Sequence, residues 1–416
     1  MDLDLEVDIY EPRRFDQPGP IGCNMCGGLM SETLVQNLAA DGIFLDTSVV
    51  QRGIDSYVLH TDVGSVRIGA PRGEVRIGTV HRGSGPRGAG PSRWGSLDQH
   101  LLTSAVRRGA KLIPVRVDDV TRTDGRPTIH ARGRTPATYD LAVVATGVNT
   151  SLLKALERLG IGYERPRLTR AVIREYRLGE ASVQRSLGTS MHVFLLNVPR
   201  LEFAALIPKG DYVTMCLLGH EIDGGVADAF AASPEVQGVM PTGFEAAPIC
   251  QCRPHMNVRG VRRPYGERVV FIGDSGVTRL YKDGLGAAYR TSKAAATTAV
   301  FHGISERAFR EHFLPLCRDI SGDNRTGRVA FRLTRLVRRL RPLRRAMLTI
   351  ARDEQRTGEG PLSGVLWDLF SGSAPYRDIL WRMVAPSLVA RWLRVLPAGL
   401  RGHSAQAQMT EGPAAS

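Results

Sequence analysis

The chain has 416 residues, of which 55 are Lys or Arg and 41 are Asp or Glu, so its formal net charge at pH 7 is +14. A hydrophobic fraction of 43% and a charged fraction of 23% are typical of a globular protein and exclude wholesale disorder. No apolar run reaches the roughly 18 residues that a membrane-spanning helix needs, and the acidic, alternating start MDLDLEVDIYEP is not a secretory signal.

The basic excess is almost entirely arginine, because only five of the basic residues are Lys. Such a skew is typical of GC-rich codon usage, so the net charge alone does not indicate a polyanionic partner. The six Cys residues are too sparse for a disulfide scaffold. We therefore expect a reducing compartment, the cytoplasm.

The chain alternates strand and helix patterns in its first third. We expect strands at 7–11, 56–60, 66–68 and 111–117, helices at 31–38 and 97–108, and Gly- and Pro-rich loops at 17–28 and 83–95. Two fully apolar strands at 141–144 and 269–272 suit the centre of a sheet covered on both faces. Residues 168–219 between them predict an antiparallel sheet.

These patterns predict an α/β fold in which a nucleotide-binding domain is interrupted by an antiparallel β substrate domain and followed by a helical extension. The predicted parts are the first half of the nucleotide-binding domain (1–165), the substrate domain (166–262), the second half (263–320), a basic helical region (321–402) and a disordered tail (403–416).

Acids and glycines follow the predicted inner strands. Glu11 ends the first strand, where an acid accepts ribose hydroxyls in dinucleotide folds, although most such residues are simply turn residues. Gly273-Asp274 closes the strand at 269–272, and residues 283–288 (DGLGAA) open a helix whose amides and dipole favour a pyrophosphate. The alternative is a Gly-rich turn with a capping Asp.

The order of these motifs resembles the flavoprotein monooxygenase and geranylgeranyl reductase superfamily, the p-hydroxybenzoate hydroxylase-like proteins. The matching elements are Glu11, Cys26-Gly27-Gly28, Asp140 before Ala145-Thr146-Gly147, Gly273-Asp274 and Asp283-Gly284-Leu285-Gly286. The Cys-Gly-Gly element is most similar to the geranylgeranyl reductase branch, and the resemblance covers about residues 5–305. It implies FAD as the cofactor and a Rossmann-like FAD-binding domain of the glutathione reductase type.

By this resemblance, Glu11 would hold the adenosine ribose and Asp274 the ribityl chain. The resemblance also implies Arg14 near the phosphates, and Val117 and Asp118 near the adenine. It implies Gly284, Leu285 and Gly286 beside the pyrophosphate and isoalloxazine, and Cys26, Gly27 and Gly28 near the flavin ring. Gly147 and Gly273 are the implied cofactor-binding glycines of their motifs.

One family element has no match. A first strand and a GxGxxG turn precede the ribose-binding acid by about thirty residues in the family, and this chain begins too late to contain them. The sequence GSGPRG at 83–88 is no substitute, because Pro86 lacks an amide and no helix follows. We expect that the true start lies upstream of Met1; the alternative is loss of a central strand.

The cysteines form two close pairs, Cys23-x-x-Cys26 and Cys250-x-Cys252. They suit a metal or iron–sulfur site, a redox dithiol, or a family loop with adventitious thiols. The last reading is favoured and no metal is expected, with Cys26 nearest to the flavin.

An apolar element in the substrate domain, Phe203 to Pro208, is similar to a stretch that lines the isoprenoid site of geranylgeranyl reductases, although only the aromatic at Phe203 and Pro208 match. It makes Phe203, Ile207 and Pro208 candidate substrate residues. The expected lining is Leu195, Leu196, Leu206 and Ile207, and a plain core explains these residues equally well.

Two cations, Arg279 and Lys282, precede the second glycine motif. They suit stabilisation of an anionic reduced flavin or an acidic headgroup, so together with Cys26 they are the candidate catalytic residues. The alternative is a pair of solvated loop cations.

Ten Arg and no acid lie between residues 324 and 352. An apolar stripe and an arginine stripe follow helical spacing there: the apolar residues are Val329, Leu333, Leu336, Leu340, Leu343 and Met347, and the arginines are Arg328, Arg332, Arg335 and Arg339. Pro342 should divide the helix. The pattern suits an anionic membrane surface or a helix packed on the protein with a solvated Arg face, and no nucleic acid is expected.

We predict an FAD-dependent oxidoreductase that transfers hydride from reduced FAD to a small apolar or isoprenoid lipid substrate, with NAD(P)H or another reductant as electron donor. The alternatives are an NAD(P)H- and FAD-dependent aromatic hydroxylase and a catalytically inactive, membrane-associated interaction protein.

Overall fold

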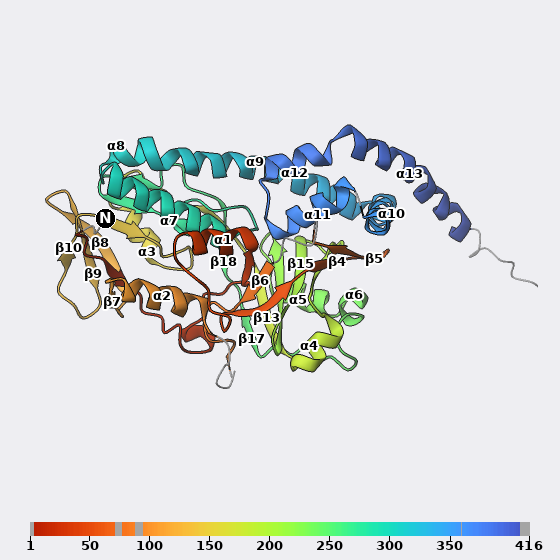
Figure 1. The fold of residues 1–416 in the computed structure, drawn as a ribbon, viewed down its shortest axis with the longest axis horizontal. Coiled ribbons are helices and arrows are strands. Elements are labelled where there is room, and N and C mark those ends of the chain that lie inside the picture. The colour runs from red at the N-terminus through yellow and green to blue at the C-terminus, as the bar shows by residue number, and fades with distance from the viewer. Residues whose placement is uncertain (1–3, 71–76, 88–94, 359, 408–416) are drawn as a thin grey trace, which may run out of the picture.

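The computed structural model describes residues 4–70, 77–87, 95–358 and 360–407. Figure 1 shows a part with short strands beside the N-terminus, a larger sheet on the other side, and a layer of C-terminal helices along one long edge.

Short parallel strands form the centre of the nucleotide-binding part. β1 (Asp8–Tyr10) pairs with β7 (Lys111–Ile113), and β11 (Ala142–Val144) pairs with β20 (Val269–Phe271), whose other neighbour is β19 (Tyr265–Gly266). β20 is fully buried, as predicted, but Val143 in the middle of β11 is 51% exposed. The prediction of two equally covered inner strands is therefore wrong for β11, because among the described residues it pairs on one side only and shares no sheet with β1.

Helices and small sheets complete this part. Ser31 begins α1 (Glu32–Ala40) by accepting a hydrogen bond from the Leu34 N–H at 3.3 Å, and Ser96 begins α2 (Leu97–Arg107) in the same way. The remaining elements are η1 (Gly19–Ile21), the sheet of β2 (Leu29–Ser31), β6 (Ile77–Val80) and β3 (Val50–Ile54), the sheet of β10 (Ala137–Thr138), β9 (Arg126–Ala131) and β8 (Val117–Thr123), α3 (Leu152–Glu157), η3 (Gly273–Ser275) and α7 (Gly284–Phe301).

The substrate domain is built on a seven-stranded sheet. Its order is β17 (Cys250–Cys252), β13 (Val172–Arg177), β16 (Tyr212–Gly219), β15 (Leu201–Lys209), β14 (Ser190–Phe194), β4 (Ser56–Thr61) and β5 (Gly64–Gly69), and β12 (Arg167–Arg170) pairs separately with β18 (His255–Arg259). Two features differ from the prediction. β4 and β5 come from the segment assigned to the first domain, and β14 pairs with β4 in parallel, so the sheet is mixed.

Both faces of this sheet are apolar. One face packs against α4 (Glu180–Ser186), α5 (Gly224–Ala231) and α6 (Pro234–Gln237). The other face packs against the C-terminal helices through a cluster that includes Phe203, Phe331, Trp367 and Phe370. β13, β14, β15 and β16 therefore contribute residues to two separate cores.

The C-terminal region is helical. It comprises α8 (Glu306–Ala308), the π-helical turn η4 (Phe309–Phe313), α9 (Leu314–Arg339), α10 (Arg341–Thr357), α11 (Pro361–Ser371), α12 (Tyr376–Met383) and α13 (Pro386–Ala407). Leu340 is extended between α9 and α10, which confirms the break predicted from Pro342. α13 continues to Ala407, so residues 403–407 are helical and not the start of a disordered tail; residues 408–416 lie outside the described residues. Among the described helices, none is both long and apolar enough to cross a membrane.

Candidate functional site

Glu11 and Asp274 lie at the ends of strands from the two halves of the nucleotide-binding part. Glu11 follows β1, where its N–H donates to the Ile113 carbonyl at 3.2 Å and its carboxylate accepts from the Arg13 N–H at 2.8 Å. Asp274 lies in η3, directly after β20. Burial raises the pKa of both carboxyls. Ligands of open α/β sheets bind at such carboxyl ends, so both acids have the positions that the sequence predicted.

A polar network that the sequence analysis missed lies beside these strand ends. Arg82 Nε donates to Asp98 Oδ1 at 2.6 Å, and Asn24 Nδ2 donates to Asp98 Oδ2 at 2.5 Å. Arg13 donates to Asn24. The charge of Asp98 acts on Glu11 and that of Arg82 on Asp274. Asp98 lies in the first turn of the amphipathic helix α2, and this position predicts a solvent-exposed acid. Its burial depends on the contact with Arg82, which comes from another segment of the chain.

The Cys26-Gly27-Gly28 loop lies against the face of the seven-stranded sheet that the C-terminal helices also use. A Cβ at Gly27 would lie 3.6 Å from Ile207 Cδ1 and 3.8 Å from Cys216 Sγ. Gly28 has φ +66°, and a Cβ there would lie 2.0 Å from the Val80 carbonyl oxygen. The fold therefore brings together the loop predicted to approach the flavin and Ile207, a predicted substrate residue.

Beneath this loop lies a buried ion pair that the sequence analysis also missed. Lys209 Nζ lies 4.0 Å from Glu175 Oε1, and the Thr214 hydroxyl lies 2.9 and 2.8 Å from the two Glu175 oxygens. Burial raises the pKa of Glu175, against the charge of Lys209. His81, after β6, has its pKa lowered to about 3 by burial and by the charge of Lys209, and its Nε2 has no hydrogen-bond partner among the described residues. A Cβ at Gly28 would lie 2.9 Å from Lys209 Nζ.

Most of the cysteines gather near this pair. The strand register places Cys216 and Cys252 in one row across β16, β13 and β17, and Cys250 opposite Glu175. Burial raises the pKa of Cys23 and Cys252, and that of Cys216 to about 12. Protonated thiols are poor nucleophiles. Within the part of the chain that the structure describes, no group of three or more His, Cys, Asp or Glu is arranged to hold a metal ion.

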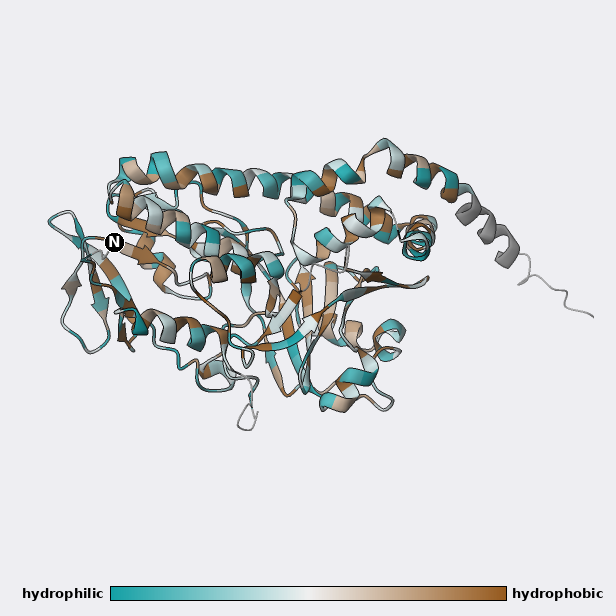
Figure 2. Ribbon diagram, viewed as in Figure 1, coloured by the Kyte–Doolittle hydropathy of each residue, from teal (hydrophilic) through white to brown (hydrophobic). Residues whose placement is uncertain are grey.

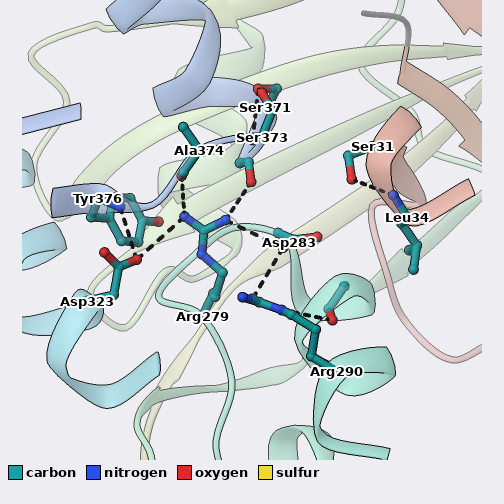
Figure 3. Close-up of polar contacts among 12 residues, drawn as sticks. Ser31, Leu34, Arg279, Asp283, Arg290, Asp323, Ser371, Ser373, Ala374 and Tyr376 are labelled. Atoms are coloured by element: carbon teal, nitrogen blue, oxygen red, sulfur yellow. Dashed lines mark hydrogen bonds and ion pairs between the residues drawn. The ribbon is translucent and has the colours of Figure 1, made fainter. Parts of the chain in front are cut away.

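The turn at 284–286 opens α7, as predicted. Asp283 precedes it with φ +51°, and a Cβ at Gly286 would lie only 2.2 Å from Asp283 Oδ1. Arg279 and Arg290 lie 3.4 and 3.7 Å from the same carboxylate (Figure 3). The positive end of α7 therefore already faces one carboxylate, beside the place where a pyrophosphate was expected.

Arg279 and Lys282 are engaged with the C-terminal helices. Arg279 donates to the Ala374 carbonyl at 2.7 Å and also to the Gly372 carbonyl (Figure 3), and Lys282 Nζ donates to the Phe370 carbonyl at 2.8 Å. Both side chains are buried. The alternative of two solvated loop cations is therefore wrong. The catalytic role of Arg279 and Lys282 stays a prediction.

The four residues predicted to line one substrate tunnel lie on two faces of the sheet. Leu195 and Ile207 belong to the core beneath the C-terminal helices, whereas Leu196 and Leu206 belong to the opposite core. The single lining is therefore wrong, because side chains alternate along strands. Phe203 is buried beneath the C-terminal helices, with its ring centroid 5.9 Å from that of Phe370. The Pro208 carbonyl accepts from the Thr79 hydroxyl at 3.1 Å.

The other predicted cofactor residues are peripheral to this centre or lie in turns. Arg14 is exposed and lies 3.6 Å from Asp16, and Val117 begins β8. Gly147 and Gly273 have φ values of +64° and +58°, which favour glycine. Their contacts with a cofactor stay predictions.

The residues present fit the sugar hydroxyls of FAD. Two partly buried carboxyls end β1 and β20, and hydroxyl donors would offset the desolvation that raises their pKa. Gly273 provides a tight turn beside Asp274. The fit is weaker at the pyrophosphate, because the Asp283 carboxylate lies over the first turn of α7.

No family model matches the chain, and no curated protein matches it. The fold of the chain does match solved structures. A geranylgeranyl bacteriochlorophyll reductase-like protein from Thermoplasma acidophilum has a TM-score of 0.63 at 12% identity, covering 94% of this chain and 92% of that one. A flavoprotein/dehydrogenase from Cytophaga hutchinsonii has 0.61 at 12% identity, covering 96% and 94%. A 2-methyl-3-hydroxypyridine-5-carboxylic acid oxygenase has 0.53 at 14% identity, covering 77% and 82%.

The chain has the FAD-binding Rossmann-type fold. The predicted fold class is confirmed, and at these identities the likeness shows the fold alone.

Proposed function

We propose that the protein is an FAD-dependent oxidoreductase that reduces an apolar substrate. The observation that carries this proposal is the position of Glu11 and Asp274 at the carboxyl ends of β1 and β20, in a fold shared with a halogenase solved in complex with FAD (TM-score 0.51, 11% identity, covering 91% of this chain and 79% of that one). In this proposal, Glu11 accepts the ribose hydroxyls and Asp274 accepts a ribityl hydroxyl.

When bound, the cofactor would supply a hydride. Reduction of a carbon–carbon double bond also consumes a proton, and Glu175 is the proposed donor because burial raises the pKa of its carboxyl. After the carboxyl has given up the proton, the Lys209 ammonium at 4.0 Å balances its negative charge. Lys209 positions this carboxyl and contacts the Cys26-Gly27-Gly28 loop through Gly28. The apolar face around Ile207 and Phe203 excludes water beside them.

The apolar face beneath the loop supports a reductase of an apolar substrate over an aromatic hydroxylase. The proposed substrate class is a polyunsaturated or isoprenoid lipid, with NAD(P)H or another reductant as donor. A hydroxylase would show oxygen uptake stimulated by an aromatic acid; a reductase would consume reduced flavin without oxygen when an isoprenoid lipid is added.

The experiment is reconstitution of the chain with FAD, followed by anaerobic reduction and addition of a geranylgeranyl lipid. We expect reoxidation of the flavin, lost in Glu175→Gln, whose flavin binding persists. Asp274→Asn should lose the flavin, and Asp353→Asn on the surface of α10 is the matched control.

A further inference from the structure

α9 docks on the protein through a face that is not the apolar stripe predicted from its sequence. In its second half the buried residues are Asn324, Gly327, Ala330, Phe331 and Arg338. The Asn324 side chain bonds to the backbone of Leu280 and Thr278, at 2.8 Å in each case, and the Tyr376 ring covers Gly327. These contacts fix which side of the helix faces outward.

Part of the apolar stripe lies on the outward side, whereas Met347 in α10 is buried in the core. Leu336, Leu340 and Val329 are 50%, 46% and 40% exposed. The seven-residue spacing of Val329 and Leu336 places them in one row along α9, beside the row of Leu333 and Leu340. Val329 and Leu336 on this face of α9, and Leu340 directly after the helix, therefore remain exposed to water.

An arginine row adjoins this stripe. Arg325, Arg332 and Arg339 share the same seven-residue spacing, and among the described residues these three and Arg328 make no hydrogen bond or ion pair. Burial lowers the pKa of Arg328, as do the charges of Arg259, Arg325 and Arg332. Arg325, Arg328 and Arg332 repel one another, and among the described residues none of the three pairs with a carboxylate, so this part of the face complements an anion. The charge of Arg339 acts on the Glu202 carboxylate.

Neighbouring helices add exposed apolar side chains to the same layer. α12, which packs against α9, exposes Trp381 and Val384, and α13 exposes Val389 and Leu393. Figure 1 shows α9 along the upper edge of the molecule, beginning above the part with the small strands, and α13 at the other end of that edge. Figure 2 shows hydrophobic and hydrophilic residues side by side along both helices.

We propose that the outward face of α9 docks on the surface of an anionic lipid bilayer. Its guanidinium groups bind lipid phosphates, and Leu336, Leu340 and Val329 enter the boundary between headgroups and acyl chains. A nucleic acid would be held by the arginines alone and would leave the leucines in water, which favours lipid. This inference goes beyond the proposed chemistry and does not depend on flavin binding.

The test is flotation of the full chain with vesicles of phosphatidylcholine alone or mixed with phosphatidylglycerol. We expect binding to the anionic vesicles that falls as salt is added. Arg332→Gln/Arg339→Gln should weaken it about 25-fold, since each arginine near the surface contributes about 1 kcal/mol. Leu336→Ser/Leu340→Ser should weaken it about tenfold or more.

Matched variants test whether vesicle binding depends on the position of these side chains on α9 and not only on total charge or hydrophobicity. Arg134→Gln/Arg177→Gln removes the same charge from exposed sites elsewhere, and Phe44→Ser removes an exposed apolar side chain near α1; both should bind as the natural chain does. Equal binding by the α9 variants and their controls would overturn the proposal. Equal binding to both vesicle types would also overturn it. A third contrary result would be an α9 arginine variant that binds vesicles as the natural chain does but is no longer retained on duplex DNA.

Discussion

Lys209 Nζ lies 4.0 Å from Glu175 Oε1 beneath the Cys26-Gly27-Gly28 loop, where Lys209 is buried and the Glu175 side chain is only 13% exposed. Removing one member of such a pair leaves the other charged and desolvated, whereas replacing both by apolar residues removes that cost.

We therefore expect Lys209→Met to lower the free energy of unfolding by about 3 kcal/mol. The double variant Lys209→Met/Glu175→Leu should recover most of that loss. Urea unfolding at neutral pH measures both. A double variant as unstable as the sum of the two single variants would show that the charges are not coupled.

Gly27 and Gly28 give a matched pair of alanine variants. Gly28→Ala should cost about 2 kcal/mol or more, because its φ is +66° and the new Cβ would meet the Val80 carbonyl at 2.0 Å. Gly27→Ala would make ordinary contacts at 3.6 and 3.8 Å, so its cost should stay below about 1 kcal/mol. Thermal unfolding measures both, and the reverse order would mean that the loop has another conformation.

Arg279 ties the loop before α7 to the C-terminal helices. It is buried and pairs with Asp283 at 3.4 Å and Asp323 at 3.7 Å. Arg279→Met should cost about 3–5 kcal/mol, because it strands two partly buried carboxylates. Arg377→Met breaks an exposed pair with Asp319 and should cost less than about 1 kcal/mol. Equal costs would contradict the assigned role of Arg279.

Two buried histidines, His81 and His192, and the half-buried His60 predict acid sensitivity. Burial lowers the pKa of His60 to about 4 and, with nearby charges, those of His81 and His192 to about 3. The unfolded chain binds these protons below pH about 6.5, so the stability that the neutral rings contribute is complete above that pH and is lost as pH falls toward 3.

Unfolding near pH 5 should therefore take up to about three protons from these groups, in addition to those of the carboxylates. The slope of unfolding free energy against pH measures this uptake. His192→Asn should flatten the slope, and His220→Gln at an exposed position should not. An unchanged slope in His192→Asn would show that this ring is charged in the native state.

Local patterns in the sequence predicted much of the fold. Ser31 and Ser96 cap helices as their spacing implied, β20 is buried, and Pro342 separates α9 from α10. Glu11 and Asp274 have the predicted strand-end positions, because a residue after a buried strand has little freedom of placement.

Partners that depend on distant chain segments could not be predicted. The pairing of β14 with β4 joins residues over a hundred positions apart. Arg279 likewise bonds to the Ala374 carbonyl, 95 positions further along the chain. The face on which Leu206 or Ile207 lies follows from register, which a fully apolar strand does not reveal. The burial of Lys209 and Asp98 likewise required the fold.

The central claim is that Glu11 and Asp274 hold a flavin nucleotide. Thermal unfolding of the full chain in rising FAD tests it most directly, with Asp274→Asn and the surface variant Asp353→Asn beside it. The account predicts a saturable rise in Tm, corresponding to about 2.7 kcal/mol at about 100 times the Kd, together with retained flavin absorbance, in the natural chain and in Asp353→Asn but not in Asp274→Asn. No retained absorbance and no rise in Tm in the natural chain would contradict it.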